Sequence, residues 1–234
     1  MPTLIVPPRF CGPPGCANGG YLSGLFAACL PSLSRIRLVR AVPIGRPLRI
    51  ENRGAQHYEL LDGEQTIALA EPGTLTLAIP KPPDYLQAIE ASRRYIGFGR
   101  HPFPNCFVCG PDRGHGDGLR IFAGAAEGLV AAPWIPDLSV AEPDGKVTAA
   151  VMCAALDCPG YFAARSDGVP MLLGEFTAHI DRRVHADAPC VLVGWQMNVS
   201  GRKYEVGTAL FDGNGQLCAR AQALWIEPRA AREP

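Results

Sequence analysis

The sequence has little charge and no excess of either sign. Only 19% of its 234 residues are charged, and 22 lysines and arginines balance 22 aspartates and glutamates. Because affinity for nucleic acid depends on neutralising phosphates, the lack of a basic block argues against a nucleic-acid partner. No segment approaches the roughly 18 uninterrupted apolar residues that a membrane span requires, so we expect no membrane partner. A small anionic ligand is still compatible with this composition.

The sequence also lacks the features of a secreted protein. Residues 1–9 carry neither the basic start nor the long apolar run of a secretory signal. The nine cysteines are an odd number, and several of them, such as Cys29, Cys190 and Cys218, have apolar surroundings. This pattern fits reduced, buried thiols better than a disulfide framework. We therefore expect a cytoplasmic protein.

Common catalytic fingerprints are missing as well. The chain contains no Gly-x-Ser-x-Gly nucleophile elbow, no phosphate-binding loop and no dinucleotide-binding glycine motif. We expect no cofactor. The hydrophobic content of 47% is nevertheless ample for a well-packed core.

What the sequence does contain is an internal repeat with a spacing of about 140 residues. Gly20 begins one apolar helical stretch, and Gly160 lies inside another; each is followed by tyrosine. Later, a Tyr-Glu pair at Tyr58 and a second at Tyr204 each precede an Asp-Gly turn. A repeat this long indicates a duplicated domain.

Each copy is predicted to be one helix followed by an antiparallel meander, which is an α+β pattern. We expect the two helices near residues 18–30 and 147–165, with each helix enclosed by its own sheet. The predicted strands are 35–42, 47–51, 56–61, 65–70 and 74–79 in the first half, and 172–185, 190–199, 203–211 and 216–227 in the second. The halves are 1–100 and 101–234, and 81–118 is a connector that contains a short helix near 84–94 and is expected to pass outside the core.

The first candidate site is the glycine-rich turn ahead of the first helix. Free backbone N–H groups at a helix start can hold an anion or polarise a carbonyl oxygen, and Gly19 and Gly20 would let a ligand approach closely. Asn18 can either cap the helix or hydrogen-bond a substrate carbonyl. Alternatively, these residues form only a turn and a cap.

The second candidate is Asp157, the only charged residue between Val147 and Ala164. A carboxylate in apolar surroundings is costly unless it is hydrogen-bonded or functional, and burial would raise its pKa towards the range of a general base. Pro159 is expected to disturb the helix and free backbone groups beside Asp157. In the alternative interpretation, Asp157 caps a new helical segment that begins at Pro159.

A third motif is the pair Cys106 and Cys109 with His101 and His115 nearby, which offers four zinc-type ligands within fifteen residues. His101 precedes a proline, His115 lies in a Gly-Asp-rich turn, and no second Cys-x-x-Cys follows. Buried thiols or a connector turn are therefore favoured over zinc, and we expect no bound metal.

Two of these segments resemble a known family. The run Ala-Asn-Gly-Gly-Tyr-Leu at Ala17–Leu22 resembles the helix start of acyl-CoA thioesterases of the hotdog superfamily. The segment Cys106–Arg120 resembles the entry segment of small bacterial hotdog thioesterases. The resemblance implies a double hotdog, in which two antiparallel sheets each wrap around a central helix, and a homodimer or larger assembly.

The resemblance also implies hydrolysis of an acyl-CoA or related acyl thioester. Asp157 would activate water or attack the carbonyl, Asn18 would orient the thioester or the water, and the N–H groups of Gly19 and Gly20 would stabilise the oxyanion. Further residues of the expected oxyanion and substrate site are Tyr21, Cys158 and Gly160. Since the first half lacks the acid and the second lacks the Asn-Gly-Gly turn, one site built from both halves is expected. The alternative is a non-catalytic protein that binds an acyl or aromatic ligand.

Overall fold

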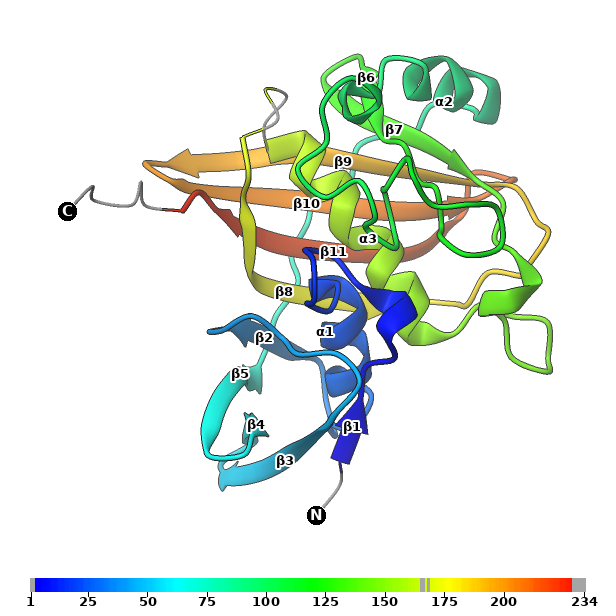
Figure 1. Cartoon of the computed structure of the whole chain (residues 1–234). Coiled ribbons are helices and arrows are strands. Elements are labelled where there is room, and N and C mark those ends of the chain that lie inside the picture. The colour runs from blue at the N-terminus through cyan, green and yellow to red at the C-terminus, as the bar shows by residue number, and fades with distance from the viewer. Residues whose placement is uncertain (1–2, 165–166, 168, 229–234) are drawn as a thin grey trace.

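The computed structural model describes residues 3–164, 167 and 169–228, which form one antiparallel sheet of eleven strands and three α-helices (Figure 1). The strands are β1 (Thr3–Ile5), β2 (Ser34–Leu38), β3 (Pro47–Gly54), β4 (His57–Asp62), β5 (Gln65–Pro72), β6 (Gly124–Ala126), β7 (Leu129–Trp134), β8 (Leu172–Ile180), β9 (Cys190–Ser200), β10 (Lys203–Asp212) and β11 (Leu217–Ile226). The helices are α1 (Gly19–Ala27), α2 (Tyr85–Ser92) and α3 (Ala149–Ala164). Within the described residues, no helix has the length and apolar character needed to cross a membrane.

The order of the strands in the sheet is nearly symmetrical about its centre. It runs β1-β3-β4-β5-β2-β8-β11-β10-β9-β7-β6, so each half places its strands in the same sequence outward from β2 or β8. At the junction, Ile36 lies opposite Phe176, and both are buried. Arg37 lies opposite Glu175, where opposite charges favour cross-strand pairing. Because β2 and β8 pair, the two halves share one continuous sheet, and the expectation of two separate sheets is not confirmed.

Helix α3 lies across the strands of the second half and forms the centre of the core (Figure 1). Its residues are almost all apolar, and all but two of those from 149 to 164 are buried. The helix continues through Pro159, so the predicted break, and with it the role of Asp157 as the cap of a new segment, is wrong. Proline fixes φ at a helical value, and dense packing on every side compensates for the single hydrogen bond that is lost.

Glycines on α1 allow that helix to lie directly against α3. A Cβ atom at Gly20 would come within 2.5 Å of the Asp157 Cβ, and one at Gly24 within 2.8 Å of the Ala150 Cα. These glycines are four residues apart, so both lie on the helix face that meets α3. The contact brings the N-terminus of α1 next to the middle of α3.

Most predicted elements are present, and the errors are confined to short or unpaired segments. Both central helices, α2 and the four strands of the second half agree with prediction to within a few residues. Residues 74–79 alternate between exposed and half-buried side chains as a strand would, but within the described chain they pair with no strand. The sequence interpretation did not include β1, β6 or β7, which are three to six residues long.

The connector does not pass outside the core, contrary to expectation. Phe107 and Val108 are fully buried, and their neighbours Cys106 and Cys109 are almost so. The backbone of this segment is satisfied by distant partners: the Phe107 N–H donates to the Cys11 carbonyl, and the Phe107 carbonyl accepts from the Leu119 N–H. Burial of a large aromatic side chain outweighs the cost of enclosing backbone that is already hydrogen-bonded.

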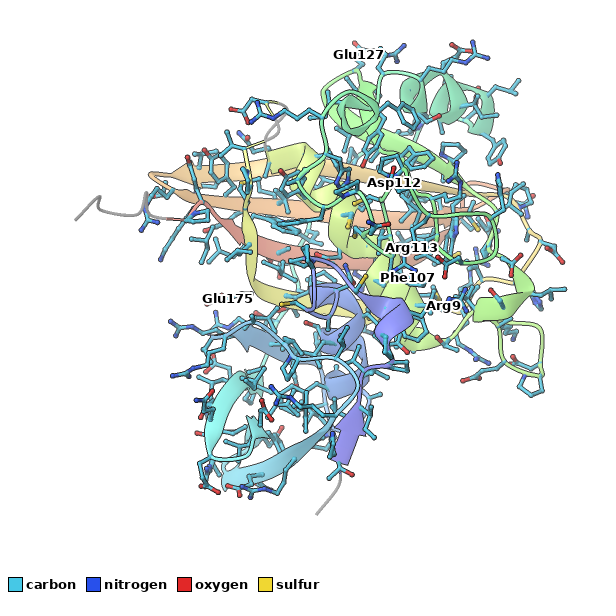
Figure 2. The ribbon with its side chains drawn as sticks, in the orientation of Figure 1. Arg9, Phe107, Asp112, Arg113, Glu127 and Glu175 are labelled. Atoms are coloured by element: carbon cyan, nitrogen blue, oxygen red, sulfur yellow. The ribbon has the colours of Figure 1, made fainter. Side chains whose placement is uncertain are left out.

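A guanidinium group covers the outer side of this buried turn. Figure 2 shows Arg9 near Phe107, and the Arg9 Cζ lies 5.7 Å from the centre of the Phe107 ring. Arg113 donates to the backbone carbonyls of Arg9 and Asn105. These contacts fix the connector to the segment that leads into α1.

Candidate functional site

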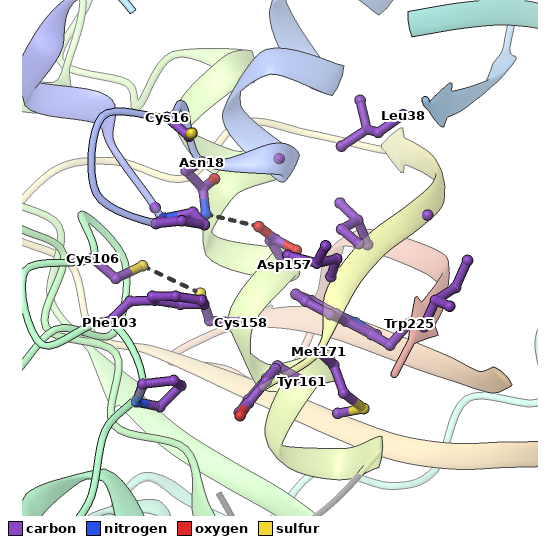
Figure 3. A pocket seen from close by; sticks show the side chains of 18 of the residues that line it. Cys16, Asn18, Leu38, Phe103, Cys106, Asp157, Cys158, Tyr161, Met171 and Trp225 are labelled. Carbon is purple, nitrogen blue, oxygen red and sulfur yellow. Dashed lines mark hydrogen bonds between the residues drawn. The ribbon is translucent and has the colours of Figure 1, made fainter. Parts of the chain in front are cut away.

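Asp157 and the turn before α1 meet where the two helices cross. The Asn18 Nδ2 donates to the Asp157 Oδ2 at 2.7 Å, and the Gly20 N–H donates to the same oxygen at 3.0 Å (Figure 3). The predicted approach of Asp157 to the Asn18 turn is therefore confirmed, although 139 residues separate Asn18 from Asp157 along the chain. The carboxylate lies at the positive end of the α1 dipole.

Of the two roles that the sequence left open for Asn18, the structure confirms the helix cap, and it adds a contact to Asp157. The Asn18 Oδ1 accepts from the Tyr21 N–H at 2.8 Å, which makes Asn18 the N-cap of α1, while its Nδ2 contacts Asp157. Its own backbone N–H donates to the Phe10 carbonyl. Since every polar atom of the amide side chain is assigned by these partners, the orientation of Asn18 is fixed.

The environment of Asp157 favours a carboxyl group that can change its protonation state. The residue is 2% exposed, and burial raises its pKa from 3.8 to about 7. Donation from the Gly20 N–H and from Asn18 opposes this rise by stabilising the ionised form. The second carboxyl oxygen, Oδ1, has no hydrogen-bond partner within the described part of the chain.

The site opens into a largely apolar cavity of about 530 Å³. Its wall includes Asn18, Gly19 and Asp157, together with the side chains of Leu38, Phe103, Tyr161, Met171, Leu173 and Trp225. Figure 3 shows Asp157 among the labelled side chains of this wall. Two exposed arginines, Arg40 and Arg202, also line the cavity. A cavity of this size and polarity fits a small ligand with an apolar body and an anionic part.

The residues predicted to form the oxyanion and substrate site do not all lie together in the structure. The N–H of Gly19, the first residue of α1, has no hydrogen-bond partner in the described chain, whereas that of Gly20 is used by Asp157. Tyr21 lies behind the turn, with its ring stacked on Phe10 at 3.9 Å between centroids.

The other two residues of that set lie further along α3. Cys158 is part of the cavity wall, but its sulfur lies beside Cys106, 3.7 Å away. Gly160 packs against β10 and Trp225, where an added Cβ would come within 2.9 Å of Val206. Gly160 is outside the cavity lining and contacts the sheet instead.

Sequence reasoning missed much of the cavity wall and one feature of the connector. Met171 directly precedes β8 and Trp225 lies near the end of β11, and no local pattern marks them as neighbours of Asp157. The sequence indicated Trp225 only as core or pocket wall, from its aromatic side chain, and Met171 gave no signal beyond a flexible apolar side chain next to a predicted strand. Among the four candidate metal ligands of the sequence, Cys106, Cys109 and His101 line the cavity, whereas His115 is exposed and is not part of the cavity wall.

Comparison with known proteins supports the fold. No protein-family model and no curated protein matches the sequence. Among solved structures, a TesB protein from Mycobacterium avium subspecies paratuberculosis matches with a TM-score of 0.60 and 14% identity, over 97% of this chain and 92% of its own. A proposed thioesterase from Novosphingobium aromaticivorans matches with a TM-score of 0.61 and 14% identity, over 97% of this chain and 95% of its own.

A proposed thioesterase II from Thermobifida fusca matches with a TM-score of 0.56 and 18% identity, over 97% of this chain and 92% of its own. At such identities the likeness establishes the fold alone, which is the hotdog fold that these three proteins share. The resemblance drawn from the two short sequence motifs is confirmed at this level.

Proposed function

We propose that this protein hydrolyses an acyl thioester, with Asp157 as the catalytic carboxylate. The observation that carries the proposal is the geometry of that group. One oxygen is held by Asn18 and Gly20, the other has no hydrogen-bond partner in the part of the chain that the structure describes, and the residue lines a cavity of about 530 Å³. An apolar cavity with a few convergent polar groups is the usual form of a small-molecule site.

In the proposed reaction, Asp157 takes a proton from a water molecule as that water attacks the carbonyl carbon of the thioester. The carbonyl oxygen gains negative charge near the start of α1, where the Gly19 N–H has no partner among the described residues. Such a donor lowers the barrier by about 3 kcal/mol when it is fixed in advance. The carbon–sulfur bond then breaks, and the proton on Asp157 passes to the departing thiolate.

We further infer that the chain is a double hotdog, in which residues 1–100 and 101–234 are the two units and share this one site. The matching strand order on either side of the β2–β8 junction supports this assignment. The exposed arginines Arg40 and Arg202 support an anionic thiol carrier such as coenzyme A. The homo-oligomer and the cytoplasmic location remain predictions.

The test is a thiol-release assay with short, long and aromatic acyl-CoA substrates on the parent protein and Asp157→Asn. The amide oxygen of asparagine can occupy the Oδ2 position and accept from both Asn18 and Gly20, so the fold should persist. Removal of the base should lower kcat by about 10²–10⁴-fold. At about 1.4 kcal/mol per decade, this corresponds to about 3–5.5 kcal/mol of barrier.

Asp112→Asn is a matched control, because it makes the same chemical change at an exposed carboxylate on the connector. It should retain full activity. If Asp157→Asn keeps full activity on a verified substrate, the role assigned to Asp157 is wrong. If the parent protein releases no thiol from any substrate but is thermally stabilised by acyl ligands, the chain is a binding protein.

A further inference from the structure

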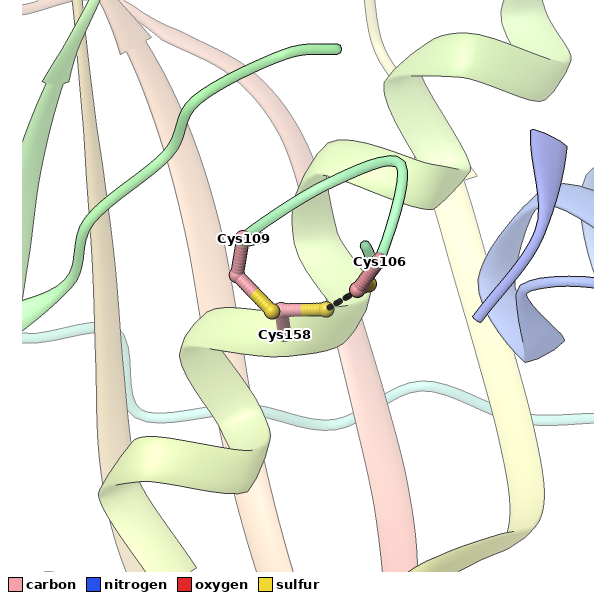
Figure 4. A group of neighbouring side chains, drawn as sticks. All are labelled: Cys106, Cys109 and Cys158. Atoms are coloured by element: carbon pink, nitrogen blue, oxygen red, sulfur yellow. Dashed lines mark hydrogen bonds between the residues drawn. The ribbon is translucent and has the colours of Figure 1, made fainter. Parts of the chain in front are cut away.

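Three cysteines from two distant parts of the chain meet beside the cavity. Cys106 and Cys109 belong to the connector, and Cys158 belongs to α3 (Figure 4). Their sulfur atoms all lie within 4.8 Å of one another, and each residue is at most 5% exposed. The connector and the helix therefore present a compact group of sulfur atoms to each other.

The spacing of these sulfurs suits a tetrahedral metal site. Cys106 Sγ and Cys158 Sγ are 3.7 Å apart. Zinc–sulfur bonds of about 2.3 Å in a tetrahedron give sulfur–sulfur edges of about 3.8 Å. A disulfide, with sulfurs about 2 Å apart, would require both residues to move.

Backbone and side-chain contacts fix the turn that carries Cys106 and Cys109. The Gly110 N–H donates to the Cys106 carbonyl at 2.9 Å, which closes the turn. A Cβ at Gly110 would come within 2.4 Å of the Pro104 carbonyl oxygen, so only glycine fits there. The Tyr95 hydroxyl donates to the Cys109 carbonyl at 2.8 Å and holds the turn from behind.

A histidine contacts the group from one side. His101 Nε2 lies 3.3 Å from Cys109 Sγ, and His101 Nδ1 accepts from the Phe103 N–H at 2.9 Å. Because Nδ1 accepts, the proton of the neutral ring is on Nε2, which donates to the sulfur. His101 in this arrangement orients the Cys109 sulfur, as outer partners of metal ligands commonly do.

We propose that Cys106, Cys109 and Cys158 together bind one zinc ion or another thiophilic divalent metal. Each sulfur binds as a thiolate, so three thiol protons are released when the metal enters. The fourth position is left for water or a ligand in the cavity, which all three cysteines line.

This inference replaces the expectation of a metal-free connector, for a reason that sequence spacing did not contain. The third ligand, Cys158, lies on α3, 52 residues from Cys106. His115, the ligand that spacing suggested, is not needed. A metal here would join the connector to α3 directly beside Asp157, and its presence is independent of whether the protein is a thioesterase.

The experiment measures metal rather than activity. The full chain is purified under reducing conditions, and its metal content is determined by inductively coupled plasma mass spectrometry. Protein freed of metal is then titrated with cobalt(II). We expect one metal per chain, and for cobalt the intense visible bands of tetrahedral coordination together with a thiolate charge-transfer band.

Serine variants assign the ligands. Cys106→Ser, Cys109→Ser and Cys158→Ser should each weaken binding at least tenfold. Cys153→Ser is the matched control: it is buried on the same helix but lies outside the group, and it should bind metal as the parent does. His101→Ala should retain the metal, because His101 is assigned as an outer partner.

Several results would overturn the proposal. These are a reduced parent protein that binds neither zinc nor cobalt, or metal binding that survives all three serine variants. Loss of the metal in His101→Ala would refute the three-sulfur ligand set. If a serine variant does not fold, the cobalt spectrum of the parent decides alone, and a spectrum without thiolate charge transfer counts against the site.

Discussion

Gly20→Ala tests whether the close contact between α1 and α3 creates the site. A methyl group at this position would be 2.5 Å from the Asp157 Cβ and 2.7 Å from the Cys153 carbonyl oxygen. Normal carbon–carbon contact is about 3.5 Å, so the helices must separate by about 1 Å. The Gly20 N–H would then lie about 4 Å from the Asp157 Oδ2, beyond hydrogen-bond range.

The expected loss of stability follows from three contributions. Overpacking a core costs about 1–3 kcal/mol. A lost hydrogen bond to a charged group costs about 1.5–3 kcal/mol. The better helix propensity of alanine returns about 1 kcal/mol. The free energy of unfolding should therefore fall by about 1.5–5 kcal/mol, and with a urea slope of about 3 kcal/mol/M the midpoint should fall by about 0.5–1.7 M.

Gly19→Ala is the control in the same urea titration, followed by circular dichroism. Its added methyl group would meet side-chain atoms and no backbone atom among its three nearest contacts, which are Leu173 Cδ2 at 2.8 Å, Leu38 Cδ1 at 3.1 Å and Leu173 Cβ at 3.3 Å. Both leucines line the cavity and can rotate into it. We expect a loss below about 1 kcal/mol. Equal midpoints for Gly19→Ala and Gly20→Ala would refute the argument from helix contact.

Two other predictions concern the cap and the connector. Asn18→Ala removes the α1 cap and one of the two donors to Asp157. In urea titration, the free energy of unfolding should fall by about 1 kcal/mol because the cap is lost. In the thiol-release assay, kcat should fall by less than it does in Asp157→Asn. An unchanged kcat would deny Asn18 a part in the reaction. Phe107→Ala should cost about 3–5 kcal/mol in the same titration, because the ring is fully buried. Phe98→Ala, at a ring that is 56% exposed, should cost far less, and similar losses would contradict the buried connector.

The sequence was sufficient for the parts of the fold that local patterns encode. The apolar runs around Leu22 and Leu156 predicted both central helices, and alternation predicted the long strands of the second half. The pairing of β2 with β8 could not be predicted, because it depends on where two separate surfaces meet. The same limit applies to residues 74–79, whose alternation is that of a strand but whose edge finds no partner among the described strands.

The candidate site also has a part that the sequence predicted and a part that it did not. The isolation of Asp157 in an apolar helix and the Asn-Gly-Gly turn were visible in the sequence, and the meeting of the two halves was inferred from what each half lacked. The meeting of Cys106 with Cys158 was not inferred, because nothing near Cys158 resembles a metal motif. Burial of Phe107 was missed because the glycine and proline residues around it are typical of an exposed loop.

The junction between β2 and β8 has a consequence for how the protein is made. A ribosome delivers α1 and β2–β5 long before α3 and β8. Until then, the donors at Asn18 and Gly20 have no carboxylate to bind, and β2 is an open edge able to pair with a second nascent chain. Contacts that span 139 residues also form slowly. Pairing of β8 with β2 closes this edge, and the same event brings Asp157 to the donors of the first half.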